Sequence, residues 1–246
     1  MRLKTSFIPS LFTILNLFSG FFAITKVIEG AYISAIILII LASIFDALDG
    51  KVARLIGKDS RFGIEFDSLA DIVSFCLAPS ILIYNVYLSE LEIVGAMIAF
   101  FPLLFGAIRL ARFNVIAQST GRKSYYLGLP VPVSAITMTS YLWFNYSIYK
   151  NYGDPRILLP MVVTLSFLMV SKIRFSLLPH ISFKRSIHYS IRSAIILLIF
   201  ISMVIKPGFV IFPFFTLFIV YHIINWMNGY EEPRIVIARR RGERNG

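Results

Sequence analysis

Long apolar runs separated by short polar segments dominate this sequence of 246 residues. A helix needs about 20 residues to cross the ~30 Å hydrocarbon core of a bilayer, and these runs reach that length. They predict eight transmembrane helices, at residues 7–27, 31–50, 67–88, 92–113, 130–149, 156–174, 188–205 and 209–228. The expected fold class is therefore all-α, a polytopic membrane helix bundle.

The composition agrees with this pattern, because 57% of the residues are hydrophobic. The segments between the runs are too short for a soluble domain, so residues 1–230 are expected to form a single integral membrane domain. Residues 231–246 are rich in arginine and lack apolar periodicity. They predict a basic cytoplasmic tail that anchors the topology, with specific recognition of anionic lipid as the alternative.

Basic residues in short loops remain on the cytoplasmic side of a membrane. With the N-terminus placed inside, 20 of the 24 Lys and Arg residues fall on the cytoplasmic side, together with the C-terminus. Only Lys26, Lys150, Arg156 and Lys206 fall outside. Because the basic blocks alternate with the spans and form no continuous stripe, membrane topology explains the net charge of +11, and no nucleic-acid partner is expected.

Four aspartates stand where the second predicted span ends and the third begins. Asp46 and Asp49 are spaced i, i+3, and Asp67 and Asp71 are spaced i, i+4, so each pair shares one helix face. A carboxylate at the bilayer centre costs about 2.5 to 3.5 kcal/mol, and less near the interface, so four of them need compensation. Either some of them take up protons or cations lie among them, and a set of oxygen ligands favours Mg²⁺ or Mn²⁺.

Small and basic residues accompany the aspartates. Gly50, Ala53 and Gly63 leave room for a ligand close to the backbone, and Arg54 and Arg61 can neutralise phosphate. Together with divalent ions, these residues suggest phosphoryl transfer. The alternative is that the aspartates are helix caps or solvated charges, which is the expected role of Asp59 and Glu65.

The spacing of these residues resembles a known signature. The pattern Asp46-x2-Asp49-Gly50-x2-Ala53-Arg54-x8-Gly63-x3-Asp67-x3-Asp71 is similar to that of the CDP-alcohol phosphatidyltransferase family at all eight fixed positions. The segments "FGIEFDSLADIVSFCLAP" (62–79), "RLARFNV" (109–115) and "GLPVPVSA" (128–135) resemble the phosphatidylserine synthase branch. One position departs from the family: Ser10 follows the early proline, where family members often carry asparagine.

The resemblance implies roles for matching positions. Asp46, Asp49, Asp67 and Asp71 would bind two divalent ions, Mg²⁺ or Mn²⁺, which clamp the pyrophosphate of the lipid donor. Asp71 would also be the general base. The residues expected to contact the cytidine and its phosphates are Asn16, Gly50, Ala53, Arg54 and Gly63.

The reaction implied is transfer of a phosphatidyl group from CDP-diacylglycerol, or from CDP-archaeol, to L-serine, with release of CMP at the cytoplasmic face of the cell membrane. A homodimer surrounded by membrane lipids is the expected assembly. The serine carboxylate needs a cationic partner. The expected serine contacts are Arg61, Arg109, Arg112, Asn114, Arg122, Lys123 and Gly128, of which Arg109 and Arg112 share a helix face at i, i+3.

Two other functions remain open. The first is the same reaction with glycerol phosphate, inositol phosphate or choline as the acceptor. The second is a metal-coupled transporter that uses carboxylates in the membrane. The sequence contains no evident inverted repeat, and its aspartates lie at a helix end, so a transporter is disfavoured.

Overall fold

The computed structural model describes residues 10–56, 61–120, 128–175, 198 and 201–229. All regular elements within these ranges are helical, which confirms the all-α class for this part of the chain. The basic tail at 231–246 lies outside the described residues. The α-helices are α1 (Leu11–Ile28), α2 (Tyr32–Ile56), α3 (Arg61–Asp71), α4 (Ala78–Ile83), α5 (Glu92–Thr120), α6 (Val131–Tyr149), α7 (Pro155–Val170) and α9 (Pro207–Met227).

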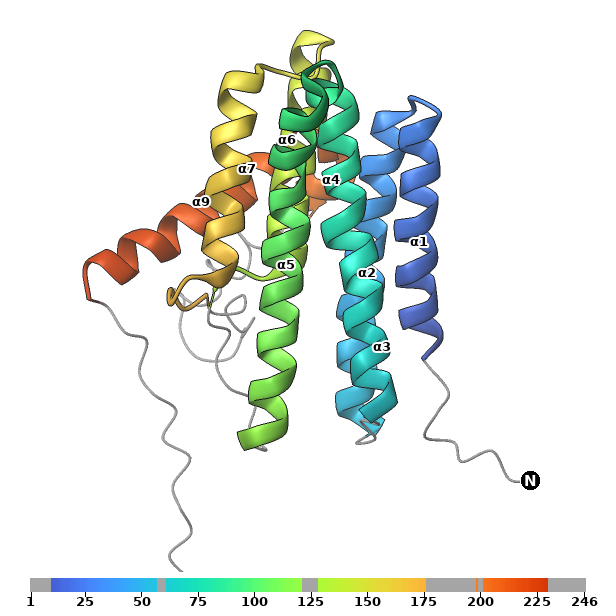
Figure 1. Ribbon diagram of the computed structural model, residues 1–246, viewed down its shortest axis with the longest axis vertical. Helices are drawn as coiled ribbons and strands as arrows, with labels where there is room; N and C mark the ends of the chain where they lie inside the picture. The colour runs from blue at the N-terminus through green and yellow to red at the C-terminus, as the bar shows by residue number, and fades with distance from the viewer. Residues whose placement is uncertain (1–9, 57–60, 121–127, 176–197, 199–200, 230–246) are drawn as a thin grey trace, which may run out of the picture.

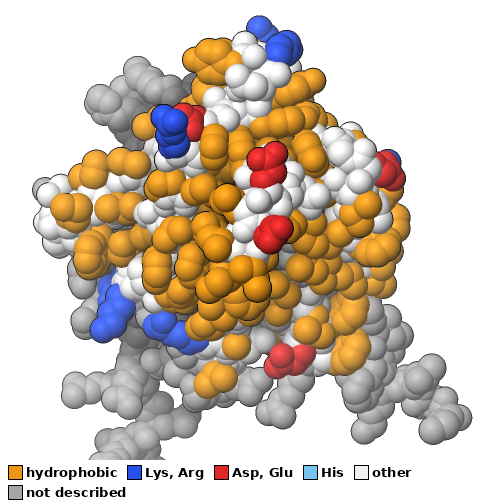
Figure 2. All heavy atoms as spheres, turned by 45° about the horizontal axis from the view of Figure 1, so that its top comes forward, with side chains coloured by type: hydrophobic (Ala, Val, Ile, Leu, Met, Phe, Trp, Pro, Cys, Tyr) orange, Lys and Arg blue, Asp and Glu red, His pale blue; other side chains and the backbone are white. Residues whose placement is uncertain are grey.

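Four stretches of the described residues are long and apolar enough to cross a membrane: 11–28, 32–52, 62–115 and 207–227. A shorter apolar helix covers 155–170. Large hydrophobic side chains are exposed along these helices, and they cover much of the face in Figure 2. The helices therefore suggest a membrane protein. The total of eight spans stays a prediction, since most of the expected span at 188–205 lies outside the described residues.

The apolar stretch 62–115 is not one straight helix. The chain reverses near Glu92, which has a φ of 46°, so that α4 and α5 run side by side (Figure 1). The polar segment "SELE" marks this reversal, and Gly95 packs against the backbone oxygen of Leu88 there. The predicted boundary between the spans 67–88 and 92–113 coincides with this turn.

The helical stretch from α3 through α4 is continuous but contains a segment with π-helical instead of α-helical hydrogen bonding. A π-helical segment, η2 (Ile72–Leu77), begins immediately after Asp71, and Pro79 follows it near the start of α4. Proline has no backbone N–H to donate, so the α-helical hydrogen-bond ladder is interrupted here. Segments of this kind often occur at functional sites. A second π-helical segment, η3 (Tyr84–Leu88), and a short 3₁₀ turn, η4 (Ser89–Leu91), follow α4.

Helix α1 packs against α2, α3 and η2, and Figure 1 draws these helices on one side of the bundle. The approach to η2 is close, because a Cβ atom on Gly20 would lie 2.3 Å from the Ser74 Oγ. Side chains at 0% to 1% exposure, such as Val27 and Ile36, fill the contact between α1 and α2. This packing brings the N-terminus of α1, the C-terminal part of α2 and all of α3 to the same end of the bundle.

The other side of the bundle is built from α5, α6, α7 and α9. Helix α9 packs on α6 and crosses the bundle obliquely in Figure 1. Aromatic pairs hold these helices: Tyr141 and Phe212 meet edge to face at 5.3 Å, and Phe105 and Phe167 lie 4.8 Å apart. The contacts of α7 with both α5 and α6 position α5, which carries the polar residues that approach η2 and α3.

Candidate active site

Three carboxylates converge between α2 and α3. Oxygen atoms of Asp46, Asp67 and Asp71 all lie within 4.8 Å of one another. Asp71 is buried, and the other two are partly buried. The i, i+4 spacing places Asp67 and Asp71 on one face of α3, and the packing of α1 against both α2 and α3 holds the two helices around this point. The sequence predicts that all four aspartates converge, and the structure groups three of them.

The cluster fits a divalent cation. Asp67 Oδ1 is buried and has no hydrogen-bond partner. Among the Lys and Arg side chains that the structure describes, which exclude Arg54 and Arg61, none forms a salt bridge with these three aspartates. At 4.8 Å, two full negative charges repel by about 3 kcal/mol if the effective dielectric constant is about 20. Carboxylate oxygens are the ligands that Mg²⁺ and Mn²⁺ prefer, so a cation would relieve this repulsion.

Asp71 is held by groups from α1 and α5. The Asn16 side chain is fully buried, and its Nδ2 donates a hydrogen bond of 3.0 Å to Asp71 Oδ1. The Ser74 hydroxyl donates to the Asn16 backbone oxygen at 2.9 Å, which fixes α1 against η2. The guanidinium of Arg109, a buried side chain, attracts the Asp71 carboxylate. The Asn16 amide thus orients one oxygen of Asp71, although burial and the nearby Asp46 and Asp67 carboxylates oppose its negative charge more strongly than Arg109 favours it.

The sequence predicts that Asn16 contacts the nucleotide, whereas the structure shows its amide nitrogen on Asp71. Its oxygen, Oδ1, is buried and has no hydrogen-bond partner, so it could still accept from a ligand. Gly50 has open space where a Cβ would stand, as close approach of a ligand requires. Gly63 lies in α3, within one turn of Asp67. The side chains of Ala53, Arg54 and Arg61 lie outside the described residues, as do Arg122 and Lys123.

Asp49 does not belong to the three-carboxylate cluster. Its Oδ1 accepts a short hydrogen bond from the Ser10 hydroxyl, and its Oδ2 accepts one of 2.6 Å from the Thr13 hydroxyl. Both hydroxyl groups come from the N-terminus of α1. The spacing of Asp46 and Asp49 places both on one face of α2, but it could not reveal these partners, which are more than 30 residues away in the chain.

The expected serine contacts on α5 have different surroundings. Arg109 is buried near Asp71, whereas Arg112 is exposed and donates to the Val170 backbone oxygen at 3.3 Å. Asn114 is buried and donates to Glu65 at 3.1 Å and to the Ser68 hydroxyl at 3.0 Å. Asn114 therefore connects α5 to α3, and Glu65 is part of a polar network that its sequence context did not predict.

Gly128 has a packing role. Its φ is 82°, a conformation that favours glycine, and its backbone N–H donates to the Ile173 oxygen at 2.8 Å. A Cβ atom here would lie 2.1 Å from the Met169 oxygen. The structure therefore explains this glycine by its tight contact with the end of α7.

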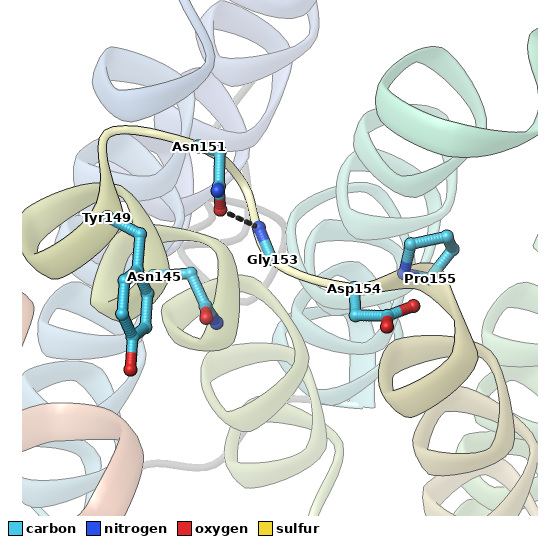
Figure 3. Close-up of a pocket in the computed structure, with 6 residues that line it drawn as sticks. All are labelled: Asn145, Tyr149, Asn151, Gly153, Asp154 and Pro155. Carbon is cyan, nitrogen blue, oxygen red and sulfur yellow. Dashed lines mark hydrogen bonds between the residues drawn. The ribbon is translucent and has the colours of Figure 1, made fainter.

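A separate pocket of about 480 Å³ lies at the connection between α6 and α7 (Figure 3). It is lined by Asn145, Tyr149, Asn151, Gly153, Asp154 and Pro155. In the figure, Asn151 accepts a hydrogen bond from the Gly153 backbone N–H, at 3.0 Å. Figure 1 draws this connection at the end of the bundle opposite α3. The acidic cluster and this pocket are therefore distinct.

Comparison with known proteins identifies the class to which this site belongs. Residues 6–173 match the model of the CDP-alcohol phosphatidyltransferase family, and the chain belongs to this family. The match covers α1 to α7 and includes all four aspartates, so the resemblance read from the signature is confirmed.

Several curated relatives have names that specify an acceptor. The chain is 34% identical over 221 residues to a CDP-diacylglycerol–serine O-phosphatidyltransferase of Helicobacter pylori, covering 89% of this chain and 90% of the relative. It is 38% identical over 175 residues to the archaetidylserine synthase of Methanothermobacter thermautotrophicus, covering 70% and 71%. A CDP-diacylglycerol–serine O-phosphatidyltransferase of Bacillus subtilis is 35% identical over 175 residues, covering 71% and 91%.

Proposed function

We propose that this protein transfers a phosphatidyl group, or its ether-lipid equivalent, from a CDP-activated lipid to the hydroxyl of L-serine, releasing CMP. The observation that carries the proposal is the convergence of Asp46, Asp67 and Asp71 within a family of CDP-alcohol phosphatidyltransferases. Serine as the acceptor is supported by relatives named as phosphatidylserine or archaetidylserine synthases, which match most of the chain. The product is then phosphatidylserine or archaetidylserine.

The acidic residues supply the metal site of this proposal. Asp46, Asp67 and Asp71, with Asp49 as a further ligand, are the side chains that would hold two divalent cations, Mg²⁺ or Mn²⁺. Bound there, the cations would neutralise charge that develops on the pyrophosphate as CMP leaves. The close approach of the three carboxylates and the unpartnered Asp67 Oδ1 support this assignment.

Asp71 is the proposed general base. Its Oδ1 already accepts the amide of Asn16, so we assign to Oδ2 the acceptance of the proton from the serine hydroxyl. As the proton moves to Asp71, the serine oxygen forms a bond to the phosphorus attached to the lipid, and the bond between that phosphorus and CMP breaks. Asn16 thus acts on the reaction through the orientation of Asp71.

The nucleotide and its phosphates are assigned to residues of α2 and α3 near the acidic cluster. Gly50, Ala53, Arg54 and Gly63 remain the proposed contacts, together with Asn16 through its buried Oδ1. The open space beside Gly50 supports close approach of a ligand to the backbone of α2.

For the serine carboxylate, Arg109 is the favoured partner because it is buried near the proposed base. Arg112 is exposed and Asn114 joins α5 to α3, which makes them weaker candidates. Arg61, Arg122 and Lys123 remain proposed partners. Gly128 is proposed to shape the serine-binding site through its backbone turn.

The membrane placement is also part of the proposal. Residues 1–230 would form one catalytic domain with eight spans, both termini in the cytoplasm and the site facing the cytoplasm. The lipid tails would then stay in the bilayer while water-soluble serine enters from inside the cell. A homodimer is the proposed assembly.

The direct test is the identity of the product. Purified protein is incubated with CDP-diacylglycerol, Mn²⁺ and each of several alcohols, and the lipid products are identified by mass spectrometry. We expect phosphatidylserine with serine, and no product with inositol phosphate or choline. Product with glycerol phosphate but not with serine would overturn the acceptor assignment. No CMP release with any alcohol would favour the remote alternative, a metal-coupled transporter.

Replacing Arg109 tests the proposed serine contact. A hydrogen bond to a charged group is worth about 1.5 to 3 kcal/mol, so Arg109→Gln is expected to raise the KM for serine by about 10-fold to 100-fold. The KM for CDP-lipid should change little. Steady-state kinetics with each substrate varied in turn measure both values.

The matched control for this substitution is Arg112→Gln, on the same helix. This exposed arginine contacts a backbone oxygen at the end of α7, so its loss is expected to leave the KM for serine nearly unchanged. An equal rise in the KM for serine in the two variants would contradict the assignment of Arg109.

A further inference from the structure

The N-terminus of α1 contacts the acidic end of α2 through two hydroxyl groups. Ser10 is the N-cap of α1, and its Oγ accepts the backbone N–H of Thr13 at 3.2 Å. The Ser10 hydroxyl also donates to Asp49 Oδ1, and the buried Thr13 hydroxyl donates to Asp49 Oδ2 at 2.6 Å. Each oxygen of this carboxylate therefore has its own hydroxyl donor from the same helix.

Helix capping alone does not account for this arrangement. An N-cap side chain only has to accept a hydrogen bond from the first turn, and Ser10 does so. The second hydroxyl, on Thr13, serves no cap, and both hydroxyls point their protons at one carboxylate from a different helix. Asp49 lies one helical turn from Asp46, which belongs to the three-carboxylate cluster.

We propose that Ser10 and Thr13 are positioning residues that orient Asp49 as a ligand for the second divalent cation. A carboxylate offers about four lone-pair sites, so two hydrogen bonds leave capacity for a cation on the same oxygens. Hydrogen bonds from outside the ligand set orient metal-binding carboxylates in this way, and their loss weakens metal affinity about 10-fold to 100-fold. This inference deepens the proposed function and relies on its assignment of Asp49 as a ligand.

Asparagine at position 10 provides a conservative variant, because its amide can both cap a helix and donate to a carboxylate. Serine retains both abilities with a shorter side chain. Ser10→Asn is therefore expected to preserve the orientation of Asp49, whereas Ser10→Ala removes the donor.

The experiment measures Mn²⁺ binding to the purified full-length protein in detergent, without CDP-lipid or serine. The electron paramagnetic resonance signal of free Mn²⁺ is followed during titration. In the double variant Ser10→Ala/Thr13→Val, affinity at one site is expected to fall about 10-fold to 100-fold while the other site keeps its affinity. Ser10→Asn, combined with the native Thr13, should bind both ions as the unmodified protein does.

The matched control is Ser19→Ala. Ser19 is a buried hydroxyl on the same helix, but it donates to the Leu15 backbone oxygen at 2.7 Å and does not contact an aspartate. Its removal should leave both Mn²⁺ sites unchanged. Because the double variant also loses the cap of α1, Thr13→Val alone provides a second test in which Ser10 still caps the helix.

Three results would overturn the proposal: no Mn²⁺ binding to the unmodified protein, unchanged affinities in Thr13→Val and in the folded double variant, or an equal loss in Ser19→Ala. The readout does not depend on the acceptor alcohol. If serine proves not to be a substrate but Mn²⁺ affinity falls as expected, the proposed function fails and the role of Ser10 and Thr13 stands.

Discussion

Asp71→Asn is expected to lower the rate of CMP release from CDP-lipid and serine by about 100-fold to 10,000-fold. A positioned general base contributes this much to a proton-transfer reaction, and the asparagine amide cannot accept the proton of the serine hydroxyl. The substitution also removes one carboxylate of the proposed metal cluster, so the larger end of the range is expected. The measurement is the initial rate of CMP formation at saturating serine and Mn²⁺.

The same chemical change at the other end of the bundle provides the control. Asp154 caps α7 by accepting the Arg156 backbone N–H at 2.8 Å, and it lines the pocket in Figure 3. Asparagine is an equally good N-cap, so Asp154→Asn should keep both stability and turnover. Full CMP-forming turnover in Asp71→Asn would refute the assignment of Asp71 as the base.

The sequence predicted the helical elements well where the apolar runs are bounded by polar residues. The expected span at 92–113 begins where α5 begins, because Glu90 and Glu92 interrupt the apolar pattern at the reversal. It did not predict the π-helical turn after Asp71. That turn lies where Pro79 interrupts the helical hydrogen bonds and where Gly20 and Ser74 pack closely between α1 and η2, a contact that hydropathy does not report.

The candidate site was predictable in its acidic centre and less so around it. The shared helix face of Asp67 and Asp71 follows from helix geometry, and the expectation that Asp46 lies nearby follows from the packing of consecutive antiparallel helices. The partners of Asp49 and of Asn114 could not be predicted in this way. Hydroxyl and amide groups are common, and these contacts join distant segments of the chain. The amide of Asn16 is a similar case, since only the packing of α1 on α3 and η2 brings it to Asp71.

Removal of divalent cations with EDTA is expected to abolish CMP release, and addition of excess Mg²⁺ or Mn²⁺ to restore it. The converging carboxylates of Asp46, Asp67 and Asp71 repel one another and cannot bind an anionic pyrophosphate without compensating positive charge. Ca²⁺ should restore less activity, because it is larger and takes six to eight oxygen ligands in a looser geometry. EDTA that is saturated with Mg²⁺ before addition controls for effects of the chelator on the membrane. Undiminished CMP release after exhaustive chelation would refute the metal site and, with it, the proposed stabilisation of the leaving group.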